Sequence, residues 1–543
     1  MSNPDGSRPD VLIIGGGTSG GIVAKQLAED GFSIVCLEQG DWVTYSDLPG
    51  DKPEYELVGG KHWHPNPNIR GRREDYPVDD SESDVAAWMY NGVGGSSVLY
   101  AACWSRFLPS DFRVRTLDGV ADDWPIGYED LRPFYEETDV EMAVSGLGGD
   151  PCYPPGAPPP LPPHPINKTG RLMAEAMNTL GWHWWPGSVS IPSADYGNLK
   201  QCARLGICRM GCPEGAKAST DLTHWPGAQS HGAKVITGAR VKEITVNEHG
   251  LASGAVYVDR DGKEHFQAAS VVVLAANGIG TPRLLLLSTS SRFPTGLANS
   301  SGLVGKRLMM HPYATVVGVY DEAVEDWLGP AGLQLQSFQF YETDTSRGFV
   351  RGCKWQLMPT GGPLGMVSRY EQGEGMQGKE FWGEQFHRSM KESTGHMLEW
   401  AIIPEDVPDE SNTVTLDPVL RDSDGLPAPK LTYRTSENTH RMLEYNIARA
   451  FEAHDAAGAK KSWVVSRAHP PGHLMGTARM GGDPETSVVD AFGRAHDVPN
   501  LYVVDGSVFV TSSGVNPTST ICALARRCGR HISAQARLQA VPA

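Results

Sequence analysis

A glycine-rich turn near the start of the chain does most to limit how this sequence can fold. Residues 10–40, DVLIIGGGTSGGIVAKQLAEDGFSIVCLEQG, hold two short apolar runs, Val11–Ile14 and Ile34–Leu37, on either side of it. Both runs are rich in β-branched residues, as strands buried in a parallel sheet usually are. Between them, apolar residues recur at helical spacing. The stretch therefore predicts a strand–helix–strand unit with parallel strands.

Gly15, Gly17 and Gly20 form the pattern G-x-G-x-x-G at the predicted junction between strand and helix. The first glycine permits the tight turn, the second lets a pyrophosphate approach the backbone, and the third allows the helix to pack closely on the strand. Free N–H groups and the dipole at the helix N-terminus favour an anion there. Glu38 ends the second strand about 20 residues on, where it can accept hydrogen bonds from a ribose. The sequence thus predicts a dinucleotide site, although FAD and NAD present the same ADP half to such a turn.

The acidic balance of the chain argues against partners with phosphate backbones. The sequence holds 64 acidic and 47 basic residues, a formal net charge of -17, so nucleic acid is not an expected partner. No apolar run approaches the roughly 20 residues that cross a bilayer, so membrane insertion is not expected either. The start, MSNPDGSRPD, lacks the basic and apolar regions of a signal peptide, and we expect a cytoplasmic protein.

Two further stretches have the pattern of a buried strand followed by a helix. SVVVLAANG (270–278) precedes TPRLLLLSTS, and NLYVVDGS (500–507) precedes NPTSTICALARRCGRHI. One sheet is therefore expected to take strands from both ends and the middle of the chain, and 543 residues exceed one typical domain. We predict two interleaved domains: a dinucleotide-binding domain of residues 8–45, 85–110, 225–310 and 465–535, and a substrate-binding domain of residues 46–84, 111–224 and 311–464.

The predicted substrate-binding domain combines strand-like runs with an extended connection. YATVVGVYD (313–321) and NTVTLDP (412–418) read as strands and indicate a mixed α+β layer. PCYPPGAPPPLPPHP (151–165) is too rich in proline for a helix or a central strand. We expect this stretch to be an extended connection on the surface.

Four separated segments carry a resemblance to a known family. They are the GGGTSGG turn with LEQG, NGVGGSSVLYAACWSRF (91–107), VVVLAANGIGTPRLLLLS (271–288), and the C-terminal run from HLMGTARM (473–480) to NLYVVDGSVFVTSSGVNPTSTICALA (500–525). In this order they resemble the glucose-methanol-choline (GMC) family of flavin-dependent alcohol oxidoreductases, over nearly the whole chain. The second segment looks like the family's glycine-serine loop, which lies against the isoalloxazine ring.

The resemblance implies an α/β fold, with a Rossmann-like FAD-binding domain and a mixed-sheet α+β substrate domain, and FAD as the cofactor. Some family members attach FAD through a histidine in the glycine-serine loop, and the matching position here is Leu99. We therefore expect FAD to be bound non-covalently. The residues expected to contact it are Gly15, Gly17, Thr18, Ser19, Gly20, Glu38, Gly94, Gly95, Ser96, Ser97, Val241, Ala276, Asp505, Gly506, Asn516, Pro517 and Thr518.

His473 lies within PPGHLMGTARMGG (470–482). The local sequence alone does not decide whether it is a catalytic base, a metal ligand or a packed core histidine. The resemblance places it at the family's catalytic histidine. Asn516 matches the second catalytic position, which is histidine or asparagine in different members, and 516 minus 473 gives the family's usual spacing of 43 residues. The alternative for Asn516 is a loop-capping residue before Pro517. His311 and His469 are interpreted as supporting or structural residues.

The chemistry of alcohol oxidation suits this pair. The hydroxyl proton has to be removed while a hydride moves from carbon to flavin N5. A neutral imidazole such as that of His473 can take the proton. Asn516 can hydrogen-bond the substrate oxygen and fix its orientation, but an amide is no proton acceptor. His473 is thus the predicted base.

Three of the nine cysteines stand close together, at the spacing C-x5-C-x3-C. Cys202, Cys208 and Cys212 could hold an iron–sulfur cluster, because thiolates are the usual ligands of such clusters. The spacing resembles that of GMC dehydrogenase subunits that carry a three-iron cluster and pass electrons to a cytochrome. Reduced structural thiols are the preferred interpretation, and a disulfide within the loop is a third alternative.

The expected reaction is oxidation of a sugar, glycoside or polyol hydroxyl, with O2, a quinone or a redox protein as electron acceptor. The aromatic residues of GWHWWPG (181–187) could stack on a sugar ring, although core packing explains them about as well. Aryl, terpenoid and steroid alcohols remain open as substrates. The alternative activities are a hydroxynitrile-lyase type of reaction without redox turnover, a nicotinamide-dependent dehydrogenase with zinc, and a non-catalytic FAD-binding protein.

Overall fold

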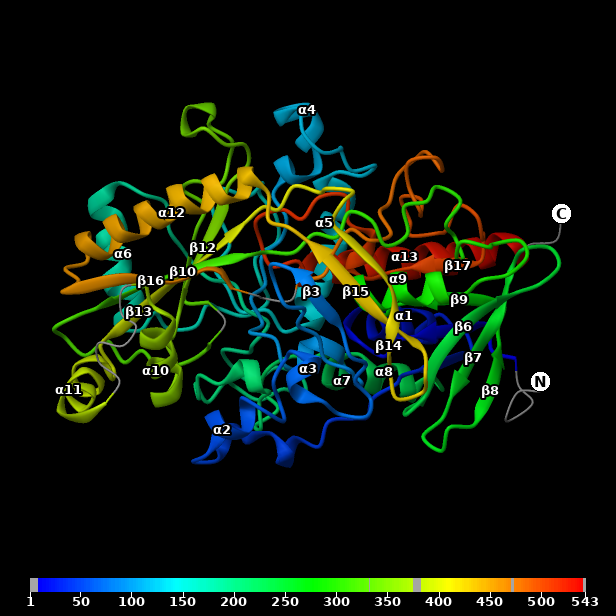
Figure 1. The fold of residues 1–543 in the computed structure, drawn as a ribbon, viewed down its shortest axis with the longest axis horizontal. Helices are drawn as coiled ribbons and strands as arrows, with labels where there is room; N and C mark the ends of the chain where they lie inside the picture. Colours follow the sequence, from blue (N-terminus) through cyan, green and yellow to red (C-terminus); the bar gives the residue numbers. More distant parts are fainter. Residues whose placement is uncertain (1–7, 332, 375–381, 470–472, 541–543) are drawn as a thin grey trace.

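The computed structural model describes residues 8–331, 333–374, 382–469 and 473–540 of the chain. Two lobes lie side by side, one built around a parallel sheet and one around an antiparallel sheet (Figure 1). Residues 1–7, and residues 470–472 of the His473 motif, lie outside the described residues.

The parallel sheet takes its strands from three distant parts of the chain. Its order within the described residues is β17-β9-β1-β2-β5, and every neighbouring pair is parallel. The strands predicted near residues 11, 34, 271 and 501 are confirmed as members of this sheet. Their bounds are Val11–Ile14 (β1), Ile34–Leu37 (β2), Lys234–Ile236 (β5), Val271–Leu274 (β9) and Leu501–Val503 (β17).

Both faces of this sheet are covered, which explains its continuous apolar runs. Val11 and Ile13 face one side, where they pack with helices α1 (Thr18–Glu29), α8 (Trp225–Ser230) and α13 (Thr518–Ala540). Leu12 and Ile14 face the other side, against α9 and a small sheet of three strands. The bounds of these are Asn277–Leu287 (α9), Arg240–Val246 (β6), Ala252–Val258 (β7) and Glu264–Ala268 (β8).

The second lobe is a six-stranded sheet in the order β16-β10-β13-β12-β11-β4, antiparallel throughout the described residues. The strand predicted within residues 313–321 is confirmed as one of its central members. The bounds are Trp185–Pro186 (β4), Tyr313–Val319 (β10), Leu335–Ser337 (β11), Cys353–Met358 (β12), Met397–Pro404 (β13) and Lys461–His469 (β16).

Successive side chains on these strands point to opposite faces of the sheet. Trp355, Leu357 and Trp400 belong to the core that packs on helices α6 (Lys168–Leu180) and α12 (Glu437–Ala456). Their neighbours in sequence face the other lobe. One face of the sheet therefore builds the core of the second lobe while the opposite face is free to line a site.

A third, mixed sheet joins distant segments of the chain. It has the order β14-β15-β3, with β14 (Thr413–Arg421) antiparallel and β3 (Asp79–Ser83) parallel to β15 (Pro427–Tyr433). The strand predicted at 412–418 is confirmed here. The remaining helices are Tyr55–Gly59 (α2), Pro67–Arg70 (α3), Val114–Asp118 (α4), Tyr128–Glu141 (α5), Thr220–Thr223 (α7), Pro363–Gln372 (α10) and Gly383–Ser393 (α11).

Across the described parts of the chain, none of these helices is long and apolar enough to span a membrane. The proline-rich stretch 151–165 forms no helix and only an isolated bridge at Leu161, as an extended connection should. Trp182 of GWHWWPG packs edge-on against Phe340 and Trp355 in the core of the second lobe, with ring centroids 5.0 and 6.1 Å away. Core packing, one of the two interpretations that the sequence left open, thus accounts for this tryptophan.

Candidate active site

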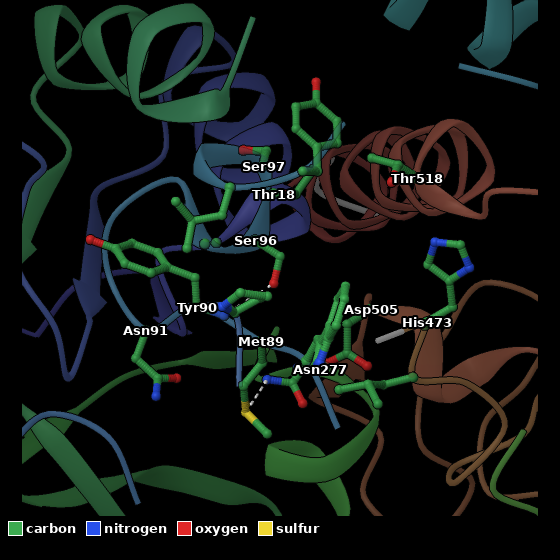
Figure 2. A pocket seen from close by; sticks show the side chains of 18 of the residues that line it. Thr18, Met89, Tyr90, Asn91, Ser96, Ser97, Asn277, His473, Asp505 and Thr518 are labelled. Carbon is green, nitrogen blue, oxygen red and sulfur yellow. Dashed lines mark hydrogen bonds between the residues drawn. The ribbon is translucent and has the colours of Figure 1, made fainter. Parts of the chain in front are cut away.

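A cavity of about 540 Å³ lies where the two lobes meet. Its walls come from the turn after β1, the loop 91–103, the segments near residues 473 and 505–521, and the inner face of the six-stranded sheet. Figure 2 shows Ser96, Asp505 and His473 turned toward the same space. Segments far apart in the sequence therefore meet around one site.

The glycine turn at the start of α1 has the close approaches that its sequence pattern requires. Gly15 has a φ of +102°, and a Cβ there would lie 2.4 Å from the carbonyl oxygen of Ala275. A Cβ on Gly20 would lie 2.1 Å from the carbonyl oxygen of Gly15. In the described structure no side chain caps the N-terminus of α1, which begins after Gly17. Thr18 and Ser19 of its first turn line the cavity, so this end of the helix faces that space.

Glu38, at the end of β2, lines the same end of the cavity. Its Oε2 accepts a hydrogen bond from the backbone N–H of Gly16 at 2.7 Å, and Oε1 accepts one from Gly40 at 2.8 Å. Burial raises the pKa of this carboxyl group, while the two backbone donors oppose that shift. The donors also fix the carboxylate so that its remaining lone pairs are available to a ribose hydroxyl.

The loop that resembles the glycine-serine loop passes directly over the α1 turn. Gly94 and Gly95 both have positive φ, +92° and +54°, and a Cβ on Gly95 would lie 2.7 Å from Cα of Gly17. The hydroxyl of Ser97 donates to the carbonyl oxygen of Gly94 at 2.6 Å and so holds the turn. Leu99 lies in the cavity wall, with an apolar side chain that offers no nucleophile for a covalent link to a cofactor.

The structure brings together nearly all the residues that the sequence assigned to a cofactor. Gly20 and Gly94 alone of that set lie behind the wall rather than in it. The others line the cavity: Gly15, Gly17, Thr18, Ser19, Glu38, Gly95, Ser96, Ser97, Val241, Ala276, Asp505, Gly506, Asn516, Pro517 and Thr518.

His473 lines the cavity and forms a pair with His311, whose role the sequence left as supporting. The two Nδ1 atoms are 2.7 Å apart, and Nε2 of His311 lies 2.8 Å from the carbonyl oxygen of Ser513. A carbonyl can only accept, so His311 carries its proton on Nε2 and its Nδ1 accepts from Nδ1–H of His473. This assignment leaves Nε2 of His473 as the atom with a free lone pair.

The environment keeps both imidazoles neutral. Burial lowers the pKa of His311 to about 4. Burial also lowers the pKa of His473 well below its usual 6.5, helped by the neighbouring His311 and by the charge of Lys354. At neutral pH His473 is therefore a neutral imidazole, with a proton on Nδ1 and none on Nε2, which is the form that a general base requires.

Asn516 stands beside this pair with both ends of its amide engaged. Its Nδ2 donates to the hydroxyl of Tyr313 at 3.1 Å, and its Oδ1 accepts from Nζ of Lys354 at 2.7 Å. The rings of Tyr313 and His473 have centroids 5.9 Å apart. Sequence reasoning missed Lys354 and Tyr313; the one available signal was a lysine inside a fully buried strand, CKWQLM.

The inner face of the six-stranded sheet adds a polar wall. Thr315, Gln356 and Glu399 alternate with core residues on β10, β12 and β13 and line the cavity. Arg209 enters the same wall from the cysteine-bearing loop, and burial lowers the pKa of its guanidinium. This end of the cavity can therefore hydrogen-bond several hydroxyl groups.

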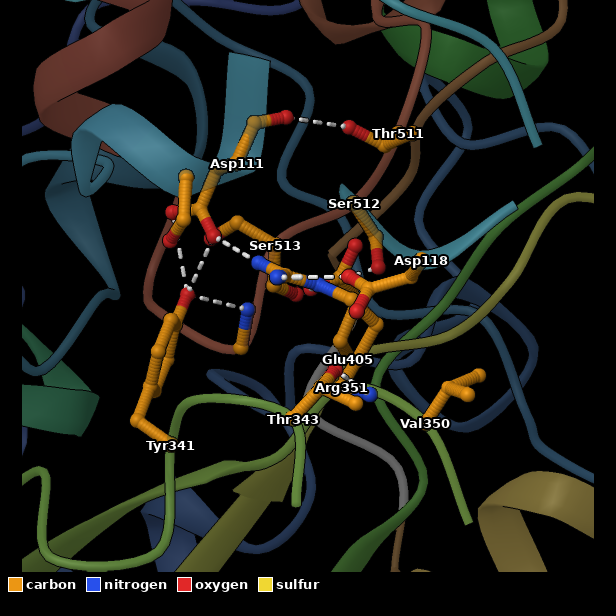
Figure 3. A network of polar contacts seen from close by, with 12 residues as sticks. Asp111, Asp118, Tyr341, Thr343, Val350, Arg351, Glu405, Thr511, Ser512 and Ser513 are labelled. Atoms are coloured by element: carbon orange, nitrogen blue, oxygen red, sulfur yellow. Dashed lines mark hydrogen bonds and ion pairs between the residues drawn. The ribbon is translucent and has the colours of Figure 1, made fainter. Parts of the chain in front are cut away.

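A buried ion cluster lies beneath the segment 511–516 (Figure 3). Nε of Arg351 donates to Glu405 at 2.7 Å and Nη2 to Asp111 at 2.6 Å. Asp118 adds a third carboxylate, 3.1 Å from Nη1. Burial raises the pKa of both Asp111 and Glu405, while the guanidinium between them acts in the opposite direction.

Tyr341 connects this cluster to the segment 511–516. Its hydroxyl donates to the carboxylate of Asp111 and accepts from the backbone N–H of Gly514 at 2.9 Å. Thr511 donates to the backbone oxygen of Asp111 at 3.1 Å. Hydrogen bonds from Thr511 and Gly514 thus fix the segment that carries Asn516 to this buried network.

Cys202, Cys208 and Cys212 are free thiols on the loop that supplies Arg209. Burial raises the pKa of Cys202 to about 12 and raises that of Cys208 as well. Iron–sulfur clusters bind cysteines as thiolates, and the cluster at these three positions stays an untested prediction.

Within the described residues, one group of three potential metal ligands has its donor atoms within 4.8 Å of one another, namely Asp150, Cys152 and His183. Nδ1 of His183 accepts from the backbone N–H of Phe338 at 3.1 Å, so its Nε2 carries the proton and donates to Asp150 at 3.0 Å. Neither nitrogen has a free lone pair for a cation, and the group is better described as a hydrogen-bonded support.

Comparison with known proteins gives consistent matches. The family model described as "GMC oxidoreductase" matches residues 10–313 and 408–525. The chain is 42% identical to 2-methyl-1,2-propanediol dehydrogenase of Mycolicibacterium austroafricanum, over 97% of this chain and 95% of that protein. It is 29% identical to the fructose dehydrogenase large subunit of Gluconobacter japonicus, over 97% and 98%.

Two solved structures share the fold over nearly their whole length. Formate oxidase of Aspergillus oryzae RIB40 has a TM-score of 0.66 at 18% identity, with 99% of this chain and 100% of that chain covered. Pyridoxine 4-oxidase of Mesorbium loti has a TM-score of 0.65 at 19% identity, with 96% and 98% covered. These likenesses confirm the predicted fold class: a Rossmann-like α/β unit joined to an α+β unit.

Proposed function

Because the chain belongs to the GMC oxidoreductase family, we propose that it oxidises an alcohol to a carbonyl compound with non-covalently bound FAD. The observation that carries this proposal is the position of His473, a neutral imidazole with a free lone pair, beside Asn516 in the cavity between the two lobes. Relatives named as dehydrogenases of a diol and of fructose support it.

The residues around the cavity fit FAD. The uncapped N-terminus of α1 offers N–H groups to a pyrophosphate, and Glu38 offers carboxylate oxygens to a ribose. The loop of Gly94 and Gly95 would lie against the isoalloxazine ring. A side chain at Gly95 would prevent its close approach to Gly17. When bound, FAD supplies the acceptor for the hydride, at flavin N5.

The protein's own residues move the proton. Nε2 of His473 accepts the hydroxyl proton of the alcohol as the carbon gives up its hydride, so a C=O bond replaces the C–H and O–H bonds. Asn516 lies beside this base and can hydrogen-bond the alcohol oxygen. His311 holds the tautomer of His473 that the reaction needs, because its own Nε2–H is committed to Ser513. These roles for His473 and Asn516 are proposals that await the variants described below.

For the substrate, we propose a small polyol, sugar or glycoside. Thr315, Gln356, Glu399 and Arg209 in the cavity wall can hydrogen-bond hydroxyl groups beyond the reacting one, which an aryl, terpenoid or steroid alcohol does not need. The names of the relatives, a diol dehydrogenase and a fructose dehydrogenase, point the same way. We propose O2, a quinone or a redox protein as the acceptor that regenerates the cofactor.

The first test is anaerobic mixing of the purified protein with alcohols while the visible spectrum is recorded. The series comprises 1,2-diols, free sugars, glycosides, polyols, aryl alcohols and sterols. Bleaching of the flavin bands by diols, polyols or sugars is the expected result. Bleaching by aryl alcohols or sterols alone would contradict the proposed polyol, sugar or glycoside and make that alcohol the substrate class. The absence of bleaching by every alcohol in the series would favour a lyase. Iron below a tenth of an equivalent per chain would remove the cluster alternative for the three cysteines.

A further inference from the structure

Lys354 is the second residue of β12, and none of its surface is exposed to solvent. In the part of the chain that the structure describes, no carboxylate lies within ion-pair distance of its Nζ. A buried ammonium group without a counter-ion is costly, and chains retain one where its charge or its donors are used. The partners of this lysine therefore indicate its role.

The ammonium group of Lys354 is held by a chain of hydrogen bonds that runs in one direction. Nζ donates to Oγ of Ser105 at 2.8 Å, and that hydroxyl donates to Oε1 of Gln336 at 3.3 Å. Nε2 of Gln336 then donates to Oδ2 of Asp150 at 3.2 Å. The carboxylate at the end can only accept, so each donor in the chain is assigned.

The same ammonium group decides which way the amide of Asn516 faces. An ammonium has donors only, so the atom of Asn516 that lies 2.7 Å from Nζ must be the oxygen. Nδ2 then lies on the other side, where one of its hydrogens meets the hydroxyl of Tyr313 and the second is left for the cavity. Without Lys354 the amide could turn and present an acceptor to the substrate.

We propose that Lys354 is a positioning residue that acts through Asn516, holding its amide so that Nδ2 donates a hydrogen bond to the oxygen of the alcohol. This inference rests on the proposed alcohol oxidation. A donor at that position stabilises the negative charge that develops on oxygen as His473 removes the proton.

The charge of Lys354 also gives the reaction a pH limit. Burial lowers the pKa of Lys354 to about 8, and the titratable groups that face it are Cys103, His311 and His473. Both histidines are neutral at neutral pH. The ammonium form therefore predominates below about pH 8, and the rate of flavin reduction is expected to fall as pH rises through that value.

The test is a double-variant cycle of Lys354→Met, Asn516→Ala and the two together, with the anaerobic rate of flavin reduction as the readout. Lys354→Met is expected to slow reduction roughly 10- to 100-fold, the cost of a misplaced catalytic group. If Lys354 acts through Asn516, the double variant is no slower than Asn516→Ala alone. Lys354→Arg, which keeps charge and donors, should recover part of the rate and abolish the decline near pH 8.

Lys217 offers a matched control for the loss of a buried lysine. It is 2% exposed, burial lowers its pKa to about 8, and its Nζ donates to the backbone oxygens of Val98, Tyr100 and Cys208. Lys217→Met is expected to lower stability as Lys354→Met does. Any loss of flavin-reduction rate in Lys217→Met should multiply with the rate loss of Asn516→Ala when the two substitutions are combined. The decline in rate near pH 8 should persist in Lys217→Met.

Urea unfolding of the same variants, without FAD, reads the contact independently of activity. If the double variant loses less in its urea midpoint than the sum of the losses of Lys354→Met and Asn516→Ala, the contact between the two side chains is confirmed. This result stands even if no alcohol reduces the wild-type protein and the proposed function fails. Additive midpoint losses overturn the contact. The positioning role is overturned if the rate loss of the double variant equals the product of the losses of the two single variants. It is also overturned if Lys354→Arg keeps the pH profile of the wild-type protein.

Discussion

Replacing His473 with alanine is expected to slow flavin reduction by roughly 10²- to 10⁴-fold, the usual contribution of a general base. The alanine removes an imidazole whose free lone pair faces the cavity, and the neighbouring amide of Asn516 cannot take a proton in its place. The measurement is stopped-flow absorbance of the flavin band under anaerobic conditions, with FAD content determined from the spectrum of each protein. FAD should remain bound, because His473 is no part of the α1 turn.

A second buried histidine supplies the control. His454 in α12 accepts from the hydroxyl of Tyr320 at 2.7 Å, and its Nε2 lies 3.3 Å from the backbone oxygen of Val316. Burial lowers its pKa to about 4, as it does for His311, but it lies in the core of the second lobe. His454→Ala should therefore reduce stability and leave flavin reduction unchanged. An unchanged rate in His473→Ala would overturn the assignment of the base.

Replacing Arg351 with methionine is expected to lower the free energy of unfolding by about 3–5 kcal/mol, the typical cost of breaking a buried ion pair from one side. The side chains of Arg351, Asp111 and Glu405 are each at most 1% exposed, so the two carboxyl groups would remain buried without their cation. Urea unfolding followed by circular dichroism measures the loss. Tyr341 and the turn that carries Asn516 rest on the same cluster, so flavin reduction should slow as well.

An exposed ion pair on a helix provides the comparison for Arg351. Arg388 and Glu384 in α11 are one turn apart, with side chains 66% and 88% exposed. Arg388→Met is expected to change the free energy of unfolding by no more than about 0.5 kcal/mol, since solvent screens such pairs. A loss below about 1 kcal/mol in Arg351→Met would show that the two carboxyl groups are protonated or rehydrated once the guanidinium is gone.

Sequence patterns predicted the parts of this protein that are local or that recur in a family. The strands at Val11–Ile14 and Val271–Leu274 could be predicted because both faces of their sheet are covered, which makes them continuous apolar runs. The positions of His473 and Asn516 followed from family resemblance, and the structure places both in one cavity. Their catalytic roles stay predictions.

The remaining parts of the site depend on contacts that no local pattern encodes. Lys354 reaches Ser105 and Asn516 across 249 and 162 residues of sequence. The pairing of His311 with His473, which fixes the tautomer of His473, spans 162 residues. The sequence could not decide between core packing and sugar stacking for Trp182 for a related reason, because side chains that pack against it, such as Phe340, lie far along the chain.

The alternation of side chains on β10, β12 and β13 has a consequence for how this enzyme can change. Odd and even positions of one strand serve separate purposes, since Trp355 and Leu357 hold the lobe together while Gln356 and Met358 meet the substrate space. A point substitution at Gln356 or Met358 leaves the tightly packed side of the sheet untouched. New substrate preferences are thus within reach of single mutations, by evolution or by design, without an accompanying loss of foldability.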